Sequence, residues 1–251
     1  MPSVPDAVAI RGEWLSLLIV AVALWWSARP LSGLLRLPNE ELGDLFWYGG
    51  LAFVGVGRLG YVALESPEAL TDPLVLIRIQ GGIEPLLGLL GVLGVLAWRT
   101  RREPALRLTW LAAASGGLVV AAIGYDVACL GRDACFGATA PAPFGFAMSG
   151  LSETRLATPL IEAALLLLLS GAVLSSGVAS SRSGVRRGLI ALGGVAALSR
   201  VALTPLSVLG TEALGLESVL FAILGVGALV VAWRDDGGEP AVVRAETATE
   251  G

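Results

Sequence analysis

The run "RLATPLIEAALLLLLSGAVL", residues 155–174, decides the fold class of this chain. After Glu162 it carries no charged residue and consists mainly of leucine and alanine. A run of about 20 apolar residues is long enough to cross a bilayer as an α-helix. Lipid offers no water to backbone N–H and C=O groups, so such a run should be helical. The run begins unusually, because Arg155 precedes it and Glu162 lies about one turn inside it.

The composition extends this reading to the whole chain of 251 residues. Hydrophobic residues make up 55% and charged residues only 15%, against about 25% charged in soluble domains. We therefore expect a polytopic membrane protein. All 17 basic residues are arginine, and histidine is absent, which removes the usual general base and the commonest zinc or haem ligand. No basic cluster suggests nucleic acid, and we expect neither a metal site nor a cofactor.

Apolar segments recur along the chain and predict an all-α bundle of seven transmembrane helices. The segments cover residues 14–35, 42–64, 74–98, 108–130, 158–179, 188–206 and 214–233. We expect residues 1–234 to form one transmembrane domain. The polar tail, residues 235–251, is predicted to be disordered because it has few residues that could form a core.

The distribution of arginine between the loops predicts the orientation in the membrane. The loops on one side hold eleven arginines: Arg29, Arg36, Arg99, Arg101, Arg102, Arg107, Arg182, Arg186, Arg187, Arg234 and Arg244. The loops on the other side hold three: Arg11, Arg132 and Arg155. This asymmetry predicts an outside N-terminus and a cytoplasmic C-terminus. Trp98, Trp110 and Trp233 would then be interface anchors at the cytoplasmic side.

Charged residues fall inside the predicted spans, among them Arg58, Arg78, Arg200, Glu84, Asp126 and Glu162. A charge in a membrane helix costs several kcal/mol, so it normally faces a partner or a polar interior. One interpretation is structural ion pairs, together with side chains that reach toward the helix ends. The other is a polar cavity that receives a charged head group, for which Arg58 and Arg200 are the best candidates.

Five motifs occur in an order that resembles a known family. They are "IRGEWLSLLIVAVAL" at 10–24, "GVGRLGYVALESP" at 55–67, "DPLVLIRIQGGIEPLLGLLG" at 72–91, "RLATPLIE" at 155–162 and "SRVALTPLS" at 199–207. Together with the seven predicted spans, they resemble the prolipoprotein diacylglyceryl transferases of the bacterial inner membrane. The family transfers a diacylglyceryl group from phosphatidylglycerol to the lipobox cysteine of a lipoprotein precursor. The resemblance implies a multi-pass protein of the bacterial plasma (inner) membrane.

The resemblance also implies a set of site residues. "RLATPLIE" aligns without gaps on the family's R-H-P-T-Q-L-Y-E box, which lines the catalytic cavity at the outer face. Arg155 and Glu162 would then be retained cavity residues, and Arg58, Tyr61, Arg155 and Arg200 would bind the lipid head group. From the residues alone, Thr158 could cap the helix. Glu162 could then simply be a carboxylate favoured by the helix dipole.

The groups that drive the family's reaction are replaced in this chain. Leu86 and Leu156 occupy the positions of two family histidines. Ala122 and Ser207 occupy the positions of two arginines, and Thr204 that of a glutamate. The reaction needs an activated thiol and cations that hold the departing glycerol phosphate. Losing one such donor typically costs about 100- to 1000-fold in rate.

These replacements leave more than one function open. The first interpretation is a catalytically degenerate relative that binds a phospholipid, with phosphatidylglycerol the expected lipid, or serves as an accessory subunit of a membrane complex. The second is an active transferase with rearranged groups that acts on lipoprotein precursors. In that case Glu84 and Glu162 are the candidate catalytic residues, and Arg78 could be a substitute cation. A carrier or channel is the third, because buried arginines could line an anion path.

Two cysteines, Cys129 and Cys135, flank "LGRDA" at the outer end of the fourth span. The outside is oxidising, so we expect a disulfide that closes the start of the long polar loop. The alternative is two free thiols without a role. A metal site is not expected from two cysteines without histidine.

Overall fold

The computed structural model describes residues 7–65, 67, 83–131, 137–141, 145–147, 153–176, 181–203 and 216–235. Within these ranges the chain forms seven α-helices: α1 (Ala7–Leu35), α2 (Asn39–Glu65), α4 (Pro85–Arg102), α5 (Arg107–Gly131), α6 (Thr158–Ser175), α7 (Arg182–Leu203) and α8 (Leu216–Arg234). The 3-10 helix η2 (Pro104–Leu106) joins α4 to α5. The strands β1 (Gly145–Ala147) and β2 (Thr154–Leu156) pair antiparallel in the segment before α6.

Each of the seven predicted apolar segments contains a helix, so the chain is predominantly helical as predicted. The third segment is helical from Pro85 onward, and residues 74–82 lie outside the described ranges. The polar segment before α6 also holds the short β1–β2 hairpin, which the sequence did not predict. Residues 236–251 of the predicted disordered tail also lie outside the described ranges, and the proposed domain limits stay a prediction.

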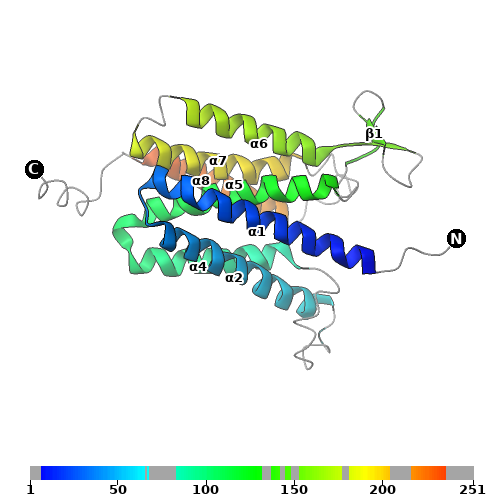
Figure 1. Cartoon of the computed structure of the whole chain (residues 1–251), viewed down its shortest axis with the longest axis horizontal. Helices are drawn as coiled ribbons and strands as arrows, with labels where there is room; N and C mark the ends of the chain where they lie inside the picture. The colour runs from blue at the N-terminus through cyan, green and yellow to red at the C-terminus, as the bar shows by residue number, and fades with distance from the viewer. Residues whose placement is uncertain are drawn as a thin grey trace, which may run out of the picture.

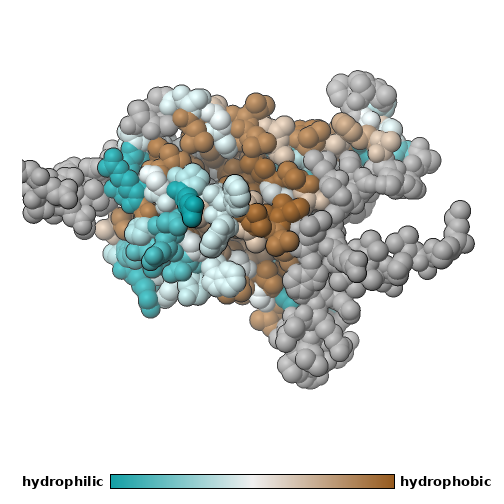
Figure 2. Space-filling model, in the orientation of Figure 1, coloured by the Kyte–Doolittle hydropathy of each residue, from teal (hydrophilic) through white to brown (hydrophobic). Residues whose placement is uncertain are grey.

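Three of the helical segments are long and apolar enough to cross a membrane. They are Ser16–Leu35, Pro104–Cys129 and Thr158–Ser175, and Ser218–Arg234 is a shorter apolar helix. The chain is therefore a multi-pass membrane protein. Figure 2 shows apolar residues over the middle of the molecule, with hydrophilic residues gathered toward the left end of the view. That α2, α4, α7 and α8 also cross the bilayer stays a prediction.

Helix α5 lies at the centre of the bundle, where it packs against α1, α6 and α7. On one side of α1 and α5, α2 packs against α4; on the other side, α7 packs against α8 (Figure 1). The larger apolar cluster joins most of these helices through buried side chains that include Leu35, Leu42, Leu96, Trp110, Ile190 and Ala232. The bundle therefore has a continuous core near the arginine-rich helix ends.

Helices α2 and α4 approach each other so closely that their backbones touch. A Cβ atom on Gly57 would lie 2.9 Å from the carbonyl oxygen of Glu84, and one on Gly91 would lie 2.7 Å from that of Ala52. Small residues at such positions are typical of helix contacts in membranes. Gly57 and Gly60 of the "GVGRLGY" motif, with Gly88 and Gly91 of the "GGIEPLLGLLG" motif, thus allow the close contact between α2 and α4.

Ion pairs fix the arginine-rich end of the bundle. Arg99 pairs with Glu41 of α2 and with Glu103, and its guanidinium lies 4.5 Å from the ring centroid of Trp110. Trp110 is fully buried and donates through Nε1 to Glu103 at 3.0 Å. The prediction that Trp110 is an interface anchor is therefore wrong, because its first-turn position on α5 faces the bundle. Trp98 and Trp233 are exposed, as an interface position requires.

Candidate functional site

Charged side chains from α5, α6 and α7 meet at the bundle end opposite the arginine-rich one. Arg200 lies in the last turn of α7. Its Nε atom is 3.0 Å from Oε1 of Glu162, and it donates through Nη2 to Oδ1 of Asp126 at 3.0 Å. Both carboxylate side chains are buried, 1% and 3% exposed, whereas Arg200 is 34% exposed. We call these three side chains the Arg200 cluster.

Two uncharged side chains also lie beside the charged groups of the Arg200 cluster. The Ser199 hydroxyl lies 2.9 Å from Oε1 of Glu162 and also 2.9 Å from the carbonyl oxygen of Ala196. The ring of Tyr125 lies 5.6 Å from the Arg200 guanidinium carbon, within the range of a cation–π contact. Glu162 and Arg200 are thus held by several partners at once, which fixes their geometry.

The start of α6 places Glu162 in this cluster. Pro159 lies in the first turn, as expected, because a missing N–H is tolerated there. The N-cap position belongs to Ala157, which has no side chain that could cap the helix. The suggested capping role of Thr158 is therefore wrong. Glu162 is directed into the bundle and is paired with Arg200, so it is more than a carboxylate at a helix start.

By formal charge, the Arg200 cluster carries −1, because two carboxylates surround one guanidinium. Oδ2 of Asp126 is buried and has no hydrogen-bond partner within the part of the chain that the structure describes. A buried carboxylate oxygen can accept a proton or a hydrogen bond from a donor. The cluster therefore offers an acceptor rather than an excess positive charge.

Arg58 and Tyr61 lie together on the other side of the bundle, on α2. Arg58 is buried, and its guanidinium carbon lies 5.5 Å from the centroid of the Tyr61 ring. Glu84 begins α4 next to them, since its backbone N–H donates to the carbonyl of Gly57 at 2.9 Å. These three predicted site residues are thus neighbours in the α2–α4 pair, whereas Arg200 belongs to α7.

Arg155 lies on β2, where it pairs across the hairpin with Phe146 and bridges to Thr139. Its side chain is partly buried. Among the described residues, no ion pair joins Arg155 to Glu162 or to Asp126. That Arg58, Arg155 and Arg200 line one cavity stays a prediction.

An apolar cluster occupies the position where the family resemblance places an arginine. Ala122 packs against buried Val119, Leu166, Leu192 and Ala196, from α5, α6 and α7. This cluster lies on the same three helices as the Arg200 cluster. Thr204 and Ser207, two other replaced positions, lie outside the described residues, as does Arg78.

Cys129 is buried near the end of α5 and is disulfide-bonded. Its predicted partner, Cys135, lies outside the described residues, so the pairing stays a prediction. Over the ranges that the structure describes, no group of three or more histidine, cysteine, aspartate or glutamate side chains could hold a metal ion.

Three members of this site were not predicted as site residues: Asp126, Tyr125 and Ser199. Asp126 carried a signal, since it is a charge inside a predicted span. Ser199 and Tyr125 carried none beyond their places next to Arg200 and Asp126, because serine and tyrosine are common in membrane helices without a role.

The known proteins that are similar in sequence to this chain share one name. No protein-family model matches the chain. A protein of Chromohalobacter salexigens is 32% identical over 175 residues, which cover 64% of this chain and 63% of the relative. Proteins of Pseudoalteromonas atlantica and Aeromonas hydrophila are 35% identical over 96 residues and 38% identical over 84 residues. These matches cover 38% and 31% of this chain, and 34% and 30% of the relatives.

All three relatives are named phosphatidylglycerol–prolipoprotein diacylglyceryl transferase. The chain spans less than two-thirds of the length of the first relative and about a third of the other two.

Proposed function

We propose that this chain, which belongs to the prolipoprotein diacylglyceryl transferase family, is a phospholipid-binding protein that has lost the transfer reaction and serves as an accessory subunit of a membrane complex. We place it in the bacterial inner membrane, with its N-terminus outside and its C-terminus in the cytoplasm. The arginine asymmetry between the loops supports this orientation.

The observation that carries this proposal is the ion pairing of Arg200 with two carboxylates. A cation that holds a departing glycerol phosphate must be available to the phosphate. Arg200 instead contacts two buried carboxylates, Asp126 and Glu162. Separating a buried carboxylate from its cation typically costs about 3–5 kcal/mol. Two N–H groups of Arg200 point at carboxylates whose combined negative charge exceeds the positive charge of Arg200. This arrangement disfavours a phosphate at Arg200, so the cluster favours a structural role over a catalytic one.

The replaced family positions support the same conclusion. Ala122 stands where the resemblance places an arginine, and it packs in an apolar cluster. Each lost charge-stabilising donor typically lowers a rate by about 100- to 1000-fold. With two arginines and the histidines replaced, little turnover is expected.

Lipid binding rests on the α2 side of the bundle. Arg58 and Tyr61 lie together in the segment that matches the family's G-x-R-L-G-Y motif. A guanidinium can donate two parallel hydrogen bonds to a phosphate. We therefore assign the head group of phosphatidylglycerol to Arg58 and Tyr61, with Arg155 of the hairpin as a further contact.

Two measurements test the proposal. The first is expression of the chain in a bacterium depleted of its own transferase, with the Chromohalobacter salexigens relative as positive control. We expect insertion into the membrane without rescue of lipoprotein processing.

The second measurement is mass spectrometry of a lipobox peptide after incubation with the purified chain and phosphatidylglycerol. An unmodified peptide, together with lipid binding that Arg58→Gln reduces, supports the proposal; a diacylglyceryl-modified peptide contradicts it.

The alternative is an active transferase with rearranged catalytic groups. Two observations favour it: the relatives are all named as transferases, and Asp126 has a buried carboxylate oxygen that could accept a proton. In that reaction a carboxylate takes the thiol proton, the sulfur attacks the glyceryl carbon, and the carbon–oxygen bond to phosphate breaks. The buried Oδ2 atom of Asp126 is a candidate acceptor for that proton. If the chain rescues a depleted strain, Asp126→Asn should abolish the rescue.

A further inference from the structure

A cavity of about 540 Å³ lies between α4, α5 and α8, away from the Arg200 cluster. Ligand pockets typically measure about 300–1000 Å³. Most of its wall is apolar, formed by Leu93 and Leu96 of α4, Leu108 and Leu111 of α5, and Val230 and Val231 of α8. The cavity is partly open, so a long ligand could extend out of it.

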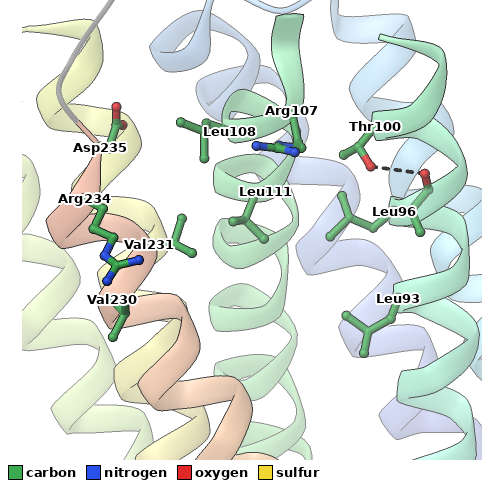
Figure 3. Close-up of a pocket in the computed structure, with 11 residues that line it drawn as sticks. Leu93, Leu96, Thr100, Arg107, Leu108, Leu111, Val230, Val231, Arg234 and Asp235 are labelled. Atoms are coloured by element: carbon green, nitrogen blue, oxygen red, sulfur yellow. Dashed lines mark hydrogen bonds between the residues drawn. The ribbon is translucent and has the colours of Figure 1, made fainter. Parts of the chain in front are cut away.

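Two arginines at helix ends line the same cavity. Arg107 is the first residue of α5, and Arg234 is the last residue of α8 (Figure 3). Both residues therefore lie where an apolar helix gives way to the arginine-rich end of the bundle. In a membrane, that boundary is the level of the lipid head groups.

The one acidic residue among those that line the cavity does not cancel this positive charge. Asp235 is buried, and its carboxylate accepts hydrogen bonds from both Nε and Nη2 of Arg186, the first at 2.6 Å. Its charge is thus already balanced by a residue outside the cavity wall. Arg107 and Arg234 are both exposed, so an anion can reach them.

We propose that this cavity binds one anionic phospholipid, with its phosphate at Arg107 and Arg234 and an acyl chain along the leucine wall. Charge complementarity identifies the head group, because an arginine guanidinium suits a phosphate and two arginines line this cavity. Because the wall of the cavity is mostly apolar, the phosphate should belong to a lipid and not be a free phosphate ion. This inference does not rest on the proposed function, since it concerns the other end of the bundle.

The test is native mass spectrometry of the purified full chain with phosphatidylglycerol or phosphatidylcholine. The informative variant is the double substitution Arg107→Gln and Arg234→Gln. Its matched control is Arg101→Gln with Arg102→Gln, which removes the same charge at the same end, from residues that do not line the cavity. Each arginine near a lipid surface adds about 1 kcal/mol, so we expect the cavity variant to bind phosphatidylglycerol about 10- to 30-fold more weakly.

A second variant keeps the proposal testable if the double substitution fails to fold. Leu93→Trp narrows the apolar part of the cavity without changing its charge, and we expect weaker binding of the same lipid. The control variant, Arg101→Gln with Arg102→Gln, should retain it. Equal binding by the cavity variant and its control would overturn the inference. So would equal retention of phosphatidylcholine, or a dimer that carries no lipid, which would assign the cavity to a second copy of the chain.

Discussion

The Nε atom of Arg200 lies 3.0 Å from Oε1 of Glu162, and this ion pair ties the last turn of α7 to the beginning of α6. The same guanidinium donates to Asp126 of α5, so one cation connects three helices. Both carboxylates are buried, and a buried carboxylate needs a partner to stay charged away from water. Arg200 is therefore expected to decide how stably this end of the bundle is assembled.

Substitution of Arg200 by glutamine should destabilise the protein strongly, because Asp126 and Glu162 would remain buried without a cation. We expect the free energy of unfolding to fall by about 3–5 kcal/mol, measured by unfolding in detergent. Arg101→Gln, on an exposed side chain, should change it little. The triple variant D126N/E162Q/R200Q should recover much of the loss. An Arg200→Gln protein as stable as the Arg101→Gln control would show that the cluster contributes nothing.

A methyl group on Gly57 should separate α2 from α4. Its Cβ atom would lie 2.5 Å from Cγ2 of Ile83 and 2.9 Å from the carbonyl oxygen of Glu84. We expect Gly57→Ala to lower the free energy of unfolding by about 1–3 kcal/mol, as overpacking does. Gly55→Ala is the matched control on the same helix, because nothing lies within 4 Å of its Cβ position. That variant should be neutral or slightly stabilising; equal losses at both positions would contradict the close contact.

The pair formed by Arg186 and Asp235 should be coupled in a double-mutant cycle. Both side chains are buried, and the carboxylate is held by two hydrogen bonds. Each single variant, Arg186→Gln or Asp235→Asn, should lower the free energy of unfolding by about 3 kcal/mol. The double variant should lose less than the sum, with a coupling of about 1–3 kcal/mol. Additive losses would mean that the two groups act independently.

The same pair should influence the cavity between α4, α5 and α8. Arg186→Gln leaves the charge of Asp235 unbalanced beside Arg107 and Arg234, so binding of phosphatidylglycerol should weaken although Arg186 does not line the cavity. Adding Asp235→Asn should restore binding. Native mass spectrometry of the two variants checks both steps, and unchanged binding in Arg186→Gln would exclude an electrostatic role for Asp235.

The disulfide of Cys129 should be visible by thiol labelling. The chain contains two cysteines, and Cys129 is disulfide-bonded. We expect no mass shift with a maleimide-linked polymer after denaturation without reductant, and labelling of two thiols after reduction. In the variant Cys129→Ser, the thiol of Cys135 should label without reductant. Labelling of two thiols in the unreduced wild-type chain would contradict the predicted pairing.

The helices were predictable because each depends on a local property, the length of an apolar run. The partners of Arg200 were not, although Glu162 and Asp126 stood out as charges inside predicted spans. An ion pair between helices depends on which helices are neighbours and how each is rotated, and an apolar run contains neither kind of information. The strands β1 and β2 escaped prediction for another reason, because three residues are too few for an alternating pattern to be recognised.

Trp110 illustrates a different limit. Its place near a helix end predicts an interface anchor, and the same reasoning holds for Trp98 and Trp233, which are exposed. Trp110 instead lies under Arg99, and Glu103 accepts its N–H group. The sequence specifies the depth of a tryptophan in the membrane, but the packing of neighbouring helices specifies whether it faces lipid or the bundle.

The glycine contact between α2 and α4 restricts how a lipid can travel. Where the carbonyl of Glu84 and that of Ala52 would obstruct even a single added carbon, no hydrocarbon tail can slip through. A lipid that enters the bundle laterally from the bilayer must therefore pass between another pair of helices. Because α2 and α4 are packed this closely, we expect the two helices to move together when the bundle opens to the bilayer.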